Sequence, residues 1–587
     1  MRRSHTTALL SLLCLTPWVG IRGQSTRLDS LDAFVKAQMA QRNVRGLSLA
    51  IVKDGKIVVA RGYGVVDDGT KAPVTTSTLF QAGSISKPVS ALGALHLVET
   101  GALSLDADVN GKLKSWKVPE NGFTTTEKVT LRRLLSHTAG LTVHGFPGYD
   151  VSVPMPTVVQ VLDGAPPVNT APIRVDTTPG AIWRYSGGGY TVAQQLMSDV
   201  TGEPFPRYMQ TTVLSKIGMT SSSFEQPPPS PRASLTASGY YADGSPVRGR
   251  WHVYPEMAAA GLWTTPTDLA KFAIEVQETL AGRGHGVVSP AMARQYVTEQ
   301  KNGYALGVGV YGPKEARRFG HGGRDEGFDA LLDAGVESGD GVVVMINAND
   351  NSPMNDRIRD FVGRTWGFAG APSTRPAPAA TVAVRLDSSR LARYAGYYEA
   401  SENNMVALAA NPDESAMQIL VDGRPAESLL AMDSVHFGSS ERPFRVAFDL
   451  DGRAATWGLG GPRERRIPRV APLPSSLQPR SDADGTLAAR ISSALAALRE
   501  GGAALASAAD VSPGAKKDFA RGDGSLADFA RATYLGEEDV TGREIRRHGG
   551  EVARVRLYRM QTDRGMRYLM VHVTPQGAVT DYDMLLR

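Results

Sequence analysis

The stretch Phe80-Gln81-Ala82-Gly83-Ser84-Ile85-Ser86-Lys87 places a serine and a lysine three residues apart, where a loop is expected to turn into a helix that ends near Gly101. Residues i and i+3 share one face of a helix, so Lys87 would stand one turn from Ser84. A serine hydroxyl needs a neighbouring group to take its proton, and a desolvated, neutral lysine amine can do this. Backbone N–H groups at a helix start can also hold a developing oxyanion.

Two simpler interpretations stand beside this one. Ser84 would act only as the N-cap of the helix, and Lys87 would be an ordinary exposed helix residue. A pattern of two residues is weak evidence by itself, although it occurs here only once. The rest of the chain therefore decides how the pattern is interpreted.

Length and composition indicate a globular protein of several domains. A chain of 587 residues predicts two to four domains, and 62 glycines with 36 prolines predict many turns. The formal net charge is +5, and three of these charges come from Arg2, Arg3 and Arg22. The rest of the chain is nearly balanced, so nothing in the composition indicates nucleic-acid binding.

The N-terminus has the features of a secretory signal peptide, assigned to residues 1–24. Arg2 and Arg3 precede an apolar run over 8–19 that is too short to span a membrane, and small residues follow it. The only cysteine, Cys14, lies inside this segment. We therefore expect an exported protein, periplasmic or secreted, without disulfides or a transmembrane segment.

Two Pro-rich linkers divide the remainder into three domains. Residues 25–366 show an α+β pattern, with a β-hairpin around Asp54-Gly55 and three antiparallel strands between 304 and 347. Residues 385–472 alternate in short strands, which predicts a small barrel-like β-domain. Residues 485–587 open with a helix and end in strands, which predicts an accessory α+β domain.

Three motifs in the first domain follow one another in an informative order: Ser84-x-x-Lys87, Tyr185-Ser186-Gly187 and His321-Gly322-Gly323. With secondary signatures near 103–106, 134–141 and 260–262, the chain resembles the serine β-lactamase and penicillin-binding-protein superfamily, on its class C side. The resemblance covers about residues 28–365 and implies a β-lactamase/transpeptidase-like fold. The middle domain looks like the small β-domain that often follows such hydrolases.

The resemblance implies a role for each motif. Ser84 would attack a carbonyl and form an acyl-enzyme, while Lys87 and Tyr185 share the proton transfers. The oxyanion hole would be the backbone N–H groups of Ser84 and Arg324. Gly322 and Gly323 would let substrate lie along a strand edge, and His321 would bind or polarise the substrate.

Two positions depart from the superfamily pattern. Gly187 stands where an asparagine amide usually binds the amide of an acyl group, and Gly322 stands where a hydroxyl residue helps to bind a carboxylate. Both departures argue against efficient β-lactam hydrolysis and strict DD-carboxypeptidase recognition. A plain turn requirement would equally explain Gly187.

The other candidate residues are interpreted structurally. His137, in a motif that precedes Gly140, is expected to hold a loop. The histidines lack metal-ligand spacing and no phosphate-binding loop is present, so no metal or cofactor is predicted. The arginines from 463 to 469 are expected to lie on the surface of the β-domain.

These observations predict an exported serine hydrolase that cleaves small esters, amides or D-amino-acid-containing peptides through Ser84. A DD-peptidase or weak β-lactamase acting on cell-wall peptides or β-lactams is the alternative within the same class. A non-catalytic peptidoglycan- or partner-binding protein is the alternative from another class. The C-terminal domains would dock a cell-wall or protein partner, or shape the cleft.

Overall fold

The computed structural model describes residues 18–241, 244–349, 351–370, 384–401, 404–421, 424–439, 444–459, 464–474, 477–519, 526, 529–543, 545–548, 550–562 and 565–585. Most of the predicted signal peptide therefore lies outside the described residues. The chain forms two compact units. The first comprises Met1–Leu103, Glu203–His252 and Ala260–Pro372, and the second comprises Ser104–Gly202, Val253–Ala259 and Ser373–Arg587.

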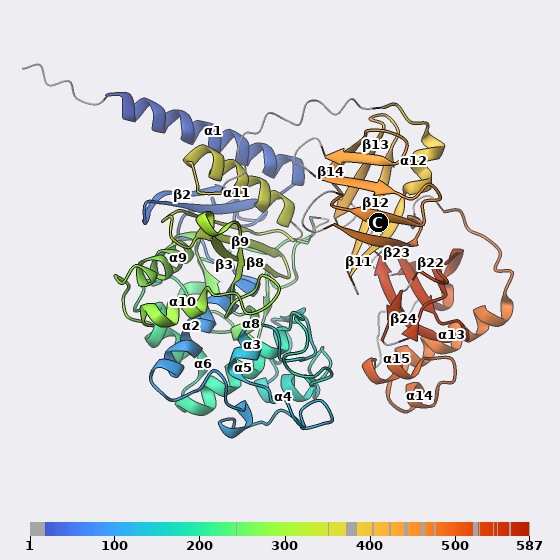
Figure 1. The fold of residues 1–587 in the computed structure, drawn as a ribbon, viewed down its shortest axis with the longest axis horizontal. Coiled ribbons are helices and arrows are strands. Elements are labelled where there is room, and N and C mark those ends of the chain that lie inside the picture. Colours follow the sequence, from blue (N-terminus) through green and yellow to red (C-terminus); the bar gives the residue numbers. More distant parts are fainter. Residues whose placement is uncertain are drawn as a thin grey trace, which may run out of the picture. The chain divides into compact units, whose positions relative to one another are not determined.

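The first unit is built on a six-stranded antiparallel sheet in the order β2-β1-β10-β9-β8-β7 (Figure 1). Its strands are β1 (Gly46–Lys53), β2 (Lys56–Gly64), β7 (Gly309–Tyr311), β8 (Arg318–Asp325), β9 (Phe328–Gly335) and β10 (Gly341–Ile346). The predicted hairpin is present, and Asp54 and Gly55 both have the positive φ of a type I′ turn. The predicted three-stranded meander has a fourth, short strand, because β7 pairs with the start of β8.

Helices cover both faces of this sheet. Helices α1 (Trp18–Arg42) and α11 (Ser352–Trp366) pack on one face, where Val35 and Ile358 meet alternate residues of β1 and β10 such as Val344. Helix α9 (Pro266–Leu280), which Thr265 caps, packs against the same two strands from the other face. The unit also contains α2 (Ser86–Glu99), α6 (Phe205–Met209), α7 (Ser230–Ala233), α10 (Pro290–Tyr296), and the two-stranded pair β3 (Phe80–Gln81) and β6 (Trp263–Thr264).

The second unit contains a helical segment with α3 (Leu131–Leu135), α4 (Val158–Asp163) and α5 (Gly187–Thr201). Helix α3 begins where the Thr130 side chain accepts a hydrogen bond from a backbone N–H. Tyr190 of α5 is fully buried and donates a 2.9 Å hydrogen bond to the Leu135 carbonyl. This contact fixes the start of α5 against the end of α3.

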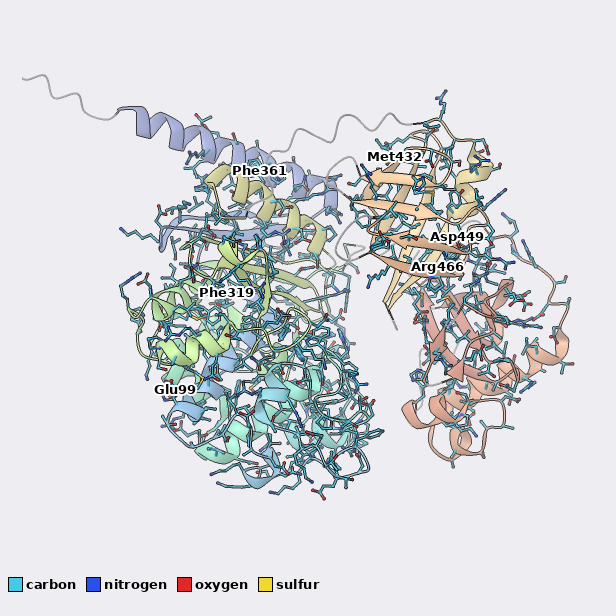
Figure 2. The ribbon with its side chains drawn as sticks, in the orientation of Figure 1. Glu99, Phe319, Phe361, Met432, Asp449 and Arg466 are labelled. Carbon is cyan, nitrogen blue, oxygen red and sulfur yellow. The ribbon has the colours of Figure 1, made fainter. Side chains whose placement is uncertain are left out.

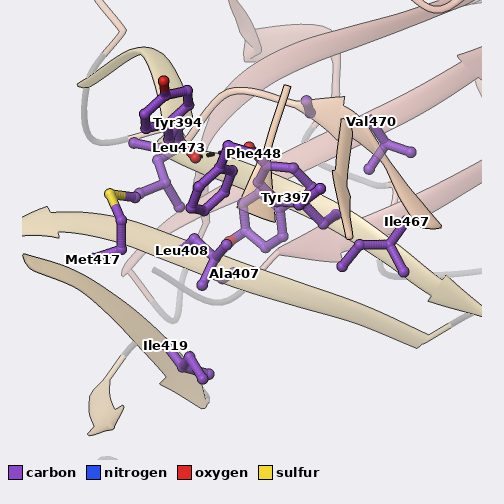
Figure 3. Close-up of a cluster of buried hydrophobic side chains, with 14 of the residues drawn as sticks. Tyr394, Tyr397, Ala407, Leu408, Met417, Ile419, Phe448, Ile467, Val470 and Leu473 are labelled. Carbon is purple, nitrogen blue, oxygen red and sulfur yellow. Dashed lines mark hydrogen bonds between the residues drawn. The ribbon is translucent and has the colours of Figure 1, made fainter. Parts of the chain in front are cut away.

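The predicted barrel-like domain is a closed eight-stranded antiparallel barrel, in which each strand pairs with the next along the chain. Its strands are β11 (Gly396–Ser401), β12 (Asn404–Asn411), β13 (Ala416–Val421), β14 (Arg424–Ala431), β15 (His436–Ser439), β16 (Arg445–Phe448), β17 (Ala454–Trp457) and β18 (Arg465–Ala471). Side chains fill its interior, where Tyr394 of α12 (Ser388–Tyr394) stacks on Phe448 at 4.5 Å (Figure 3). The arginine-rich segment is the closing strand β18, and its exposed Arg466 pairs with Asp449 (Figure 2).

The C-terminal α+β part consists of helices followed by a four-stranded sheet in the order β19-β22-β23-β24. Its main elements are α13 (Gly485–Glu500), α14 (Gly502–Ser507), α15 (Pro513–Asp518), β19 (Thr533–Asp539), β22 (Arg554–Thr562), β23 (Gly565–Val573) and β24 (Val579–Leu585). Its sheet shares one hydrophobic cluster with the barrel, to which Leu557 and Met570 contribute. The buried Arg547 adds a 2.6 Å ion pair to Glu399 of β11. Within the described part of the chain, no helix has both the length and the apolarity to cross a membrane.

Candidate active site

Ser84 and Lys87 meet at the junction between a 3-10 turn, Gly83–Ile85, and α2. Lys87 Nζ lies 2.9 Å from Ser84 Oγ, within hydrogen-bond distance. Ser84 is half-buried, whereas Lys87 is only 2% exposed. Both simpler interpretations of this motif are therefore wrong. Ile85 is the N-cap of α2, with no side-chain cap, and Lys87 is not a surface residue.

Burial lowers the pKa of Lys87 from 10.5 to about 7, and the negative charge of Asp325 acts in the opposite direction. Desolvation disfavours the ammonium form, so a large fraction of the amine is neutral near pH 7. A neutral amine can accept the Ser84 hydroxyl proton, which an ammonium cannot. The pair thus has the protonation state that a nucleophilic serine requires.

Two glycines bring strand β8 against the serine turn. A β-carbon on Gly83 would lie 2.3 Å from the Arg324 backbone nitrogen, and one on Gly323 would lie 2.0 Å from the Ala82 carbonyl oxygen. Neither distance is compatible with a side chain, and Gly83 also has a φ of +50°. The close approach puts the Arg324 amide beside the turn that carries Ser84, as an oxyanion hole formed by these two residues requires.

His321 is held by two neighbours on the same unit. Its burial and the Lys87 charge lower the pKa of the imidazole to about 4, so it is neutral at pH 7. Its Nδ1 lies 2.5 Å from the Gly322 carbonyl, which can only accept, so Nδ1 carries the proton. Nε2 must then accept from the Tyr304 hydroxyl at 3.0 Å. The His321 imidazole is therefore neutral and accepts a hydrogen bond from Tyr304.

The Tyr185 ring contacts two histidine rings in the second unit. Its ring centroid is 4.2 Å from that of His137 and 4.9 Å from that of His144. His137 Nδ1 also accepts a 3.1 Å hydrogen bond from the backbone N–H of Ser186. His137 does hold a loop, as predicted, and the loop it holds is the one that carries Tyr185.

Gly187 and Gly322, the two positions that depart from the superfamily pattern, have different surroundings. A β-carbon on Gly322 would meet only the Ala330 carbonyl at 4.0 Å, so this position has room for a side chain. A β-carbon on Gly187 would lie 2.9 Å from the Phe146 ring. Gly187 has no positive φ, so a turn requirement does not explain why this residue is a glycine. The close approach of the Phe146 side chain explains it.

The structure thus distributes the predicted residues over both units. Ser84, Lys87, His321 and Arg324 belong to the first unit, and Tyr185 belongs to the second with Gly187. Sequence reasoning missed three neighbours of these residues: Asp325, Tyr304 and Phe146. The pair Asp325-Glu326 resembles an ordinary polar turn, and Tyr304 and Phe146 lie in loops without a periodic pattern. Only the three-dimensional contacts connect them to the site.

One group of ligand-type side chains occurs among the described residues, in the C-terminal sheet. Donor atoms of His572, Asp581 and Asp583 all lie within 4.8 Å of one another. His572 Nε2 is 2.8 Å from Asp583, and the buried Arg547 guanidinium is 3.3 Å from Asp581. Arg547 already supplies the positive charge that a metal ion would bring, so the cluster fits an ion-pair network.

Ser84 is hydrogen-bonded to the buried Lys87 at the start of a helix, beside a strand of the antiparallel sheet that carries glycines. This arrangement is typical of the serine β-lactamase and penicillin-binding-protein-like class. The comparisons agree with this assignment. Residues 31–364 match the family model described as Beta-lactamase. The chain belongs to this family of serine hydrolases.

Individual relatives are distant. Protein flp of Staphylococcus aureus (strain N315) is 24% identical over 345 residues, which cover 55% of this chain. The chain spans 63% of the length of that relative. Penicillin-binding protein 4 of Amycolatopsis lactamdurans is 26% identical over 367 residues, which cover 58% of this chain and 92% of the length of that protein.

A solved structure shows the same fold over a longer stretch. The octameric penicillin-binding protein homologue from Pyrococcus abyssi superimposes with a TM-score of 0.52 and 22% identity. The alignment covers 75% of this chain and 99% of that chain. The shared part is therefore longer than the residues matched by the family model.

Proposed function

We propose that this protein is an exported serine hydrolase that forms an acyl-enzyme on Ser84. Its substrates would be small esters, amides or D-amino-acid-containing peptides. The observation that carries the proposal is the 2.9 Å contact between Ser84 Oγ and the nearly inaccessible Lys87 Nζ, whose pKa is about 7. A binding protein without catalysis would not need to bury a lysine amine against a serine, because burial of an ionisable amine destabilises the fold.

Each residue has a defined task in the proposed reaction. Lys87 takes the proton of Ser84 as the hydroxyl oxygen attacks the substrate carbonyl, and the backbone N–H groups of Ser84 and Arg324 stabilise the oxyanion. Tyr185 then donates a proton to the departing oxygen or nitrogen. Water attacks the acyl-enzyme in the second half-reaction, and its proton returns through the same groups.

Intact-mass spectrometry of the mature protein with a fluorophosphonate tests the proposal directly. We expect a single adduct that is absent in Ser84→Ala, and slow labelling of Lys87→Met. Ser86→Ala is the matched control, because Ser86 is a neighbouring serine whose hydroxyl accepts from the Leu262 backbone N–H at 3.0 Å. No adduct on the wild-type protein would favour the alternative of a binding protein.

A parallel incubation with benzylpenicillin separates the branches within the hydrolase class. A stable penicilloyl adduct would favour the DD-peptidase alternative, and rapid turnover would favour a β-lactamase. Fluorophosphonate labelling without penicilloylation is the result we expect, because Gly187 and Gly322 lack the side chains that the resemblance associates with those substrates.

Export and the role of the C-terminal domains are parts of the same proposal. Export to the periplasm or medium predicts that N-terminal sequencing of the secreted protein begins near residue 25. Partner docking through the barrel and C-terminal sheet predicts that a chain ending at residue 372 keeps its esterase kinetics but loses association with cell-wall material. Altered kinetics on every substrate would instead favour a role of these domains in shaping the cleft.

A further inference from the structure

Exposure alternates along the second half of β8. His321, Gly323 and Asp325 are less exposed than Gly322 and Arg324, which lie between them in the strand. Alternate residues of a strand project to the same face of its sheet, so positions 321, 323 and 325 share one face. The charged side chain of Arg324 projects from the opposite face.

The face of β8 that carries Gly323 lies against the turn before α2. A β-carbon on Gly323 would lie 2.0 Å from the Ala82 carbonyl oxygen and 3.2 Å from Ile85 Cγ1. The turn between Ala82 and Ile85 carries Ser84, and Lys87 follows in the first turn of α2. The two side chains that flank Gly323 on this face therefore lie on either side of the place where Ser84 meets Lys87.

Both of these side chains interact electrostatically with Lys87. Burial lowers the pKa of Lys87 to about 7, and the negative charge of Asp325 opposes this change by stabilising the ammonium form. Burial and then the charge of Lys87 lower the pKa of His321 to about 4. Charge interactions weaken with distance, so these two effects agree with the strand geometry, which places His321 and Asp325 beside Lys87.

The two neighbours of Lys87 differ in charge. His321 is neutral, because its Nδ1 donates to the Gly322 carbonyl at 2.5 Å and its Nε2 accepts from the Tyr304 hydroxyl at 3.0 Å. Asp325 is only 4% exposed, and both of its carboxylate oxygens are inaccessible to solvent. A carboxylate shielded from water acts on a nearby charge more strongly than an exposed one does. Asp325 is thus the neighbour that can stabilise a positive charge on Lys87.

We propose that Asp325 is a positioning residue, whose carboxylate stabilises the ammonium that Lys87 becomes when it takes the Ser84 proton. This inference rests on the proposed function. In this step the Ser84 O–H bond breaks and an N–H bond forms on Lys87, while Ser84 Oγ bonds to the substrate carbonyl carbon and the carbonyl oxygen becomes negative. Asp325 keeps its charge throughout and accepts no proton. The nucleophile, its base and this counter-charge all belong to the first unit.

Asp325→Asn separates the two effects that the carboxylate has on Lys87. Without the carboxylate, more of the amine is neutral at pH 6, but the amine is a weaker base toward Ser84 at every pH. At pH 9 Lys87 is neutral in both proteins, because its pKa is about 7 with the carboxylate present. We expect the fluorophosphonate labelling rate of Asp325→Asn to be about tenfold below that of the wild type at pH 9, and within about threefold of it at pH 6.

Two results would overturn the inference. One is an unchanged labelling rate of Asp325→Asn at pH 9. The other is a decrease by the same factor at both pH values, because a loss of packing alone would slow labelling equally at each pH. Glu326→Gln is the matched control, since it removes a carboxylate from the next residue, which is more exposed, and should leave both rates within about twofold of the wild type.

A charge-retaining variant adds a second comparison. Asp325→Glu keeps the carboxylate, so its labelling rate at pH 9 should stay within about threefold of the wild type. A decrease as large as that of Asp325→Asn would contradict the proposed role of the charge.

Failure of this inference is distinguishable from failure of the proposed function. A thermal unfolding midpoint within a few degrees of that of the wild type establishes that a variant is folded. If Asp325→Asn does not meet this criterion, Asp325→Ser carries the same comparison, because serine also removes the charge and needs less space. Absence of labelling in the wild type itself would reject the proposed function, whereas equal labelling of the wild type and Asp325→Asn at pH 9 would reject only the role of Asp325.

Discussion

Lys87→Met is expected to make the protein more stable while it slows the fluorophosphonate labelling of Ser84. The pKa of Lys87 is about 7 in the folded protein and 10.5 in an unfolded chain. Because the folded pKa is the lower one, the unfolded state binds more protons between these values, and stability rises with pH across this window. At 1.36 kcal/mol for each pKa unit, the native lysine costs about 5 kcal/mol at pH 6 and between about 1 and 2 kcal/mol at pH 9.5. Methionine of similar size removes this cost.

The assay is denaturant-induced unfolding of both proteins at the two pH values. Loss of the Ser84–Lys87 hydrogen bond and added apolar burial are independent of pH, so the change in the stability gain between pH 6 and 9.5 isolates the lysine. We expect this gain to shrink by about 3 kcal/mol as the pH rises. A gain of equal size at both pH values would refute the reasoning, and so would a variant that is less stable at pH 6. Ser84→Ala, which keeps the buried amine, should show no such pH dependence.

Three further outcomes follow from the same site and from the C-terminal domain. Asp325→Asn removes the negative charge that raises the pKa of Lys87. The pH at which the fluorophosphonate labelling rate is half-maximal, near 7 in the wild type, should therefore decrease. An unchanged value would exclude an interaction between Asp325 and Lys87. Gly323→Ala should abolish labelling and Gly322→Ala should not, because a β-carbon meets a backbone oxygen at 2.0 Å in the first case and nothing nearer than 4.0 Å in the second. Arg556→Met should lower the free energy of unfolding by about 3 kcal/mol in a chemical denaturation experiment. The substitution removes the ion pair of this nearly inaccessible arginine with Asp482 and one of the two arginine partners of Glu537. Unchanged stability would mean that those carboxylates are fully solvated.

Much of the fold could be predicted because local patterns were strong. The hairpin around Asp54-Gly55, the capped helix after Thr265 and the strands of the barrel all agree with turn chemistry and apolar periodicity. Strand β7 was missed because three residues give no periodicity, and β19 because its residues Glu537, Glu538 and Asp539 are polar for an edge strand.

Only those residues of the candidate site that belong to a sequence motif could be predicted. Ser84 and Lys87 are linked by helical spacing, so their contact follows from the sequence alone. Phe146 and Tyr304 are linked to Gly187 and His321 only through tertiary contacts, which a single sequence does not report. Gly187 illustrates this limit of the sequence. The reason for a glycine at this position is the Phe146 ring, 41 residues away in the chain, and not the local turn.

The order of strands in the six-stranded sheet has a consequence for how the chain folds during synthesis. Strand β1 lies inside the sheet, between β2 and β10, and its first residue Gly46 donates a hydrogen bond to the Asn347 side chain, 301 residues later. During synthesis the β1–β2 hairpin therefore has one edge unpaired until β10 is made, because Leu47 pairs with Ile346, 299 residues later. The longest-range strand pair of the barrel, β11 with β18, joins Tyr397 to Ala471, only 74 residues apart. Contacts of such long range slow folding and expose strand edges to association. The six-stranded sheet should thus depend on chaperones far more than the barrel does.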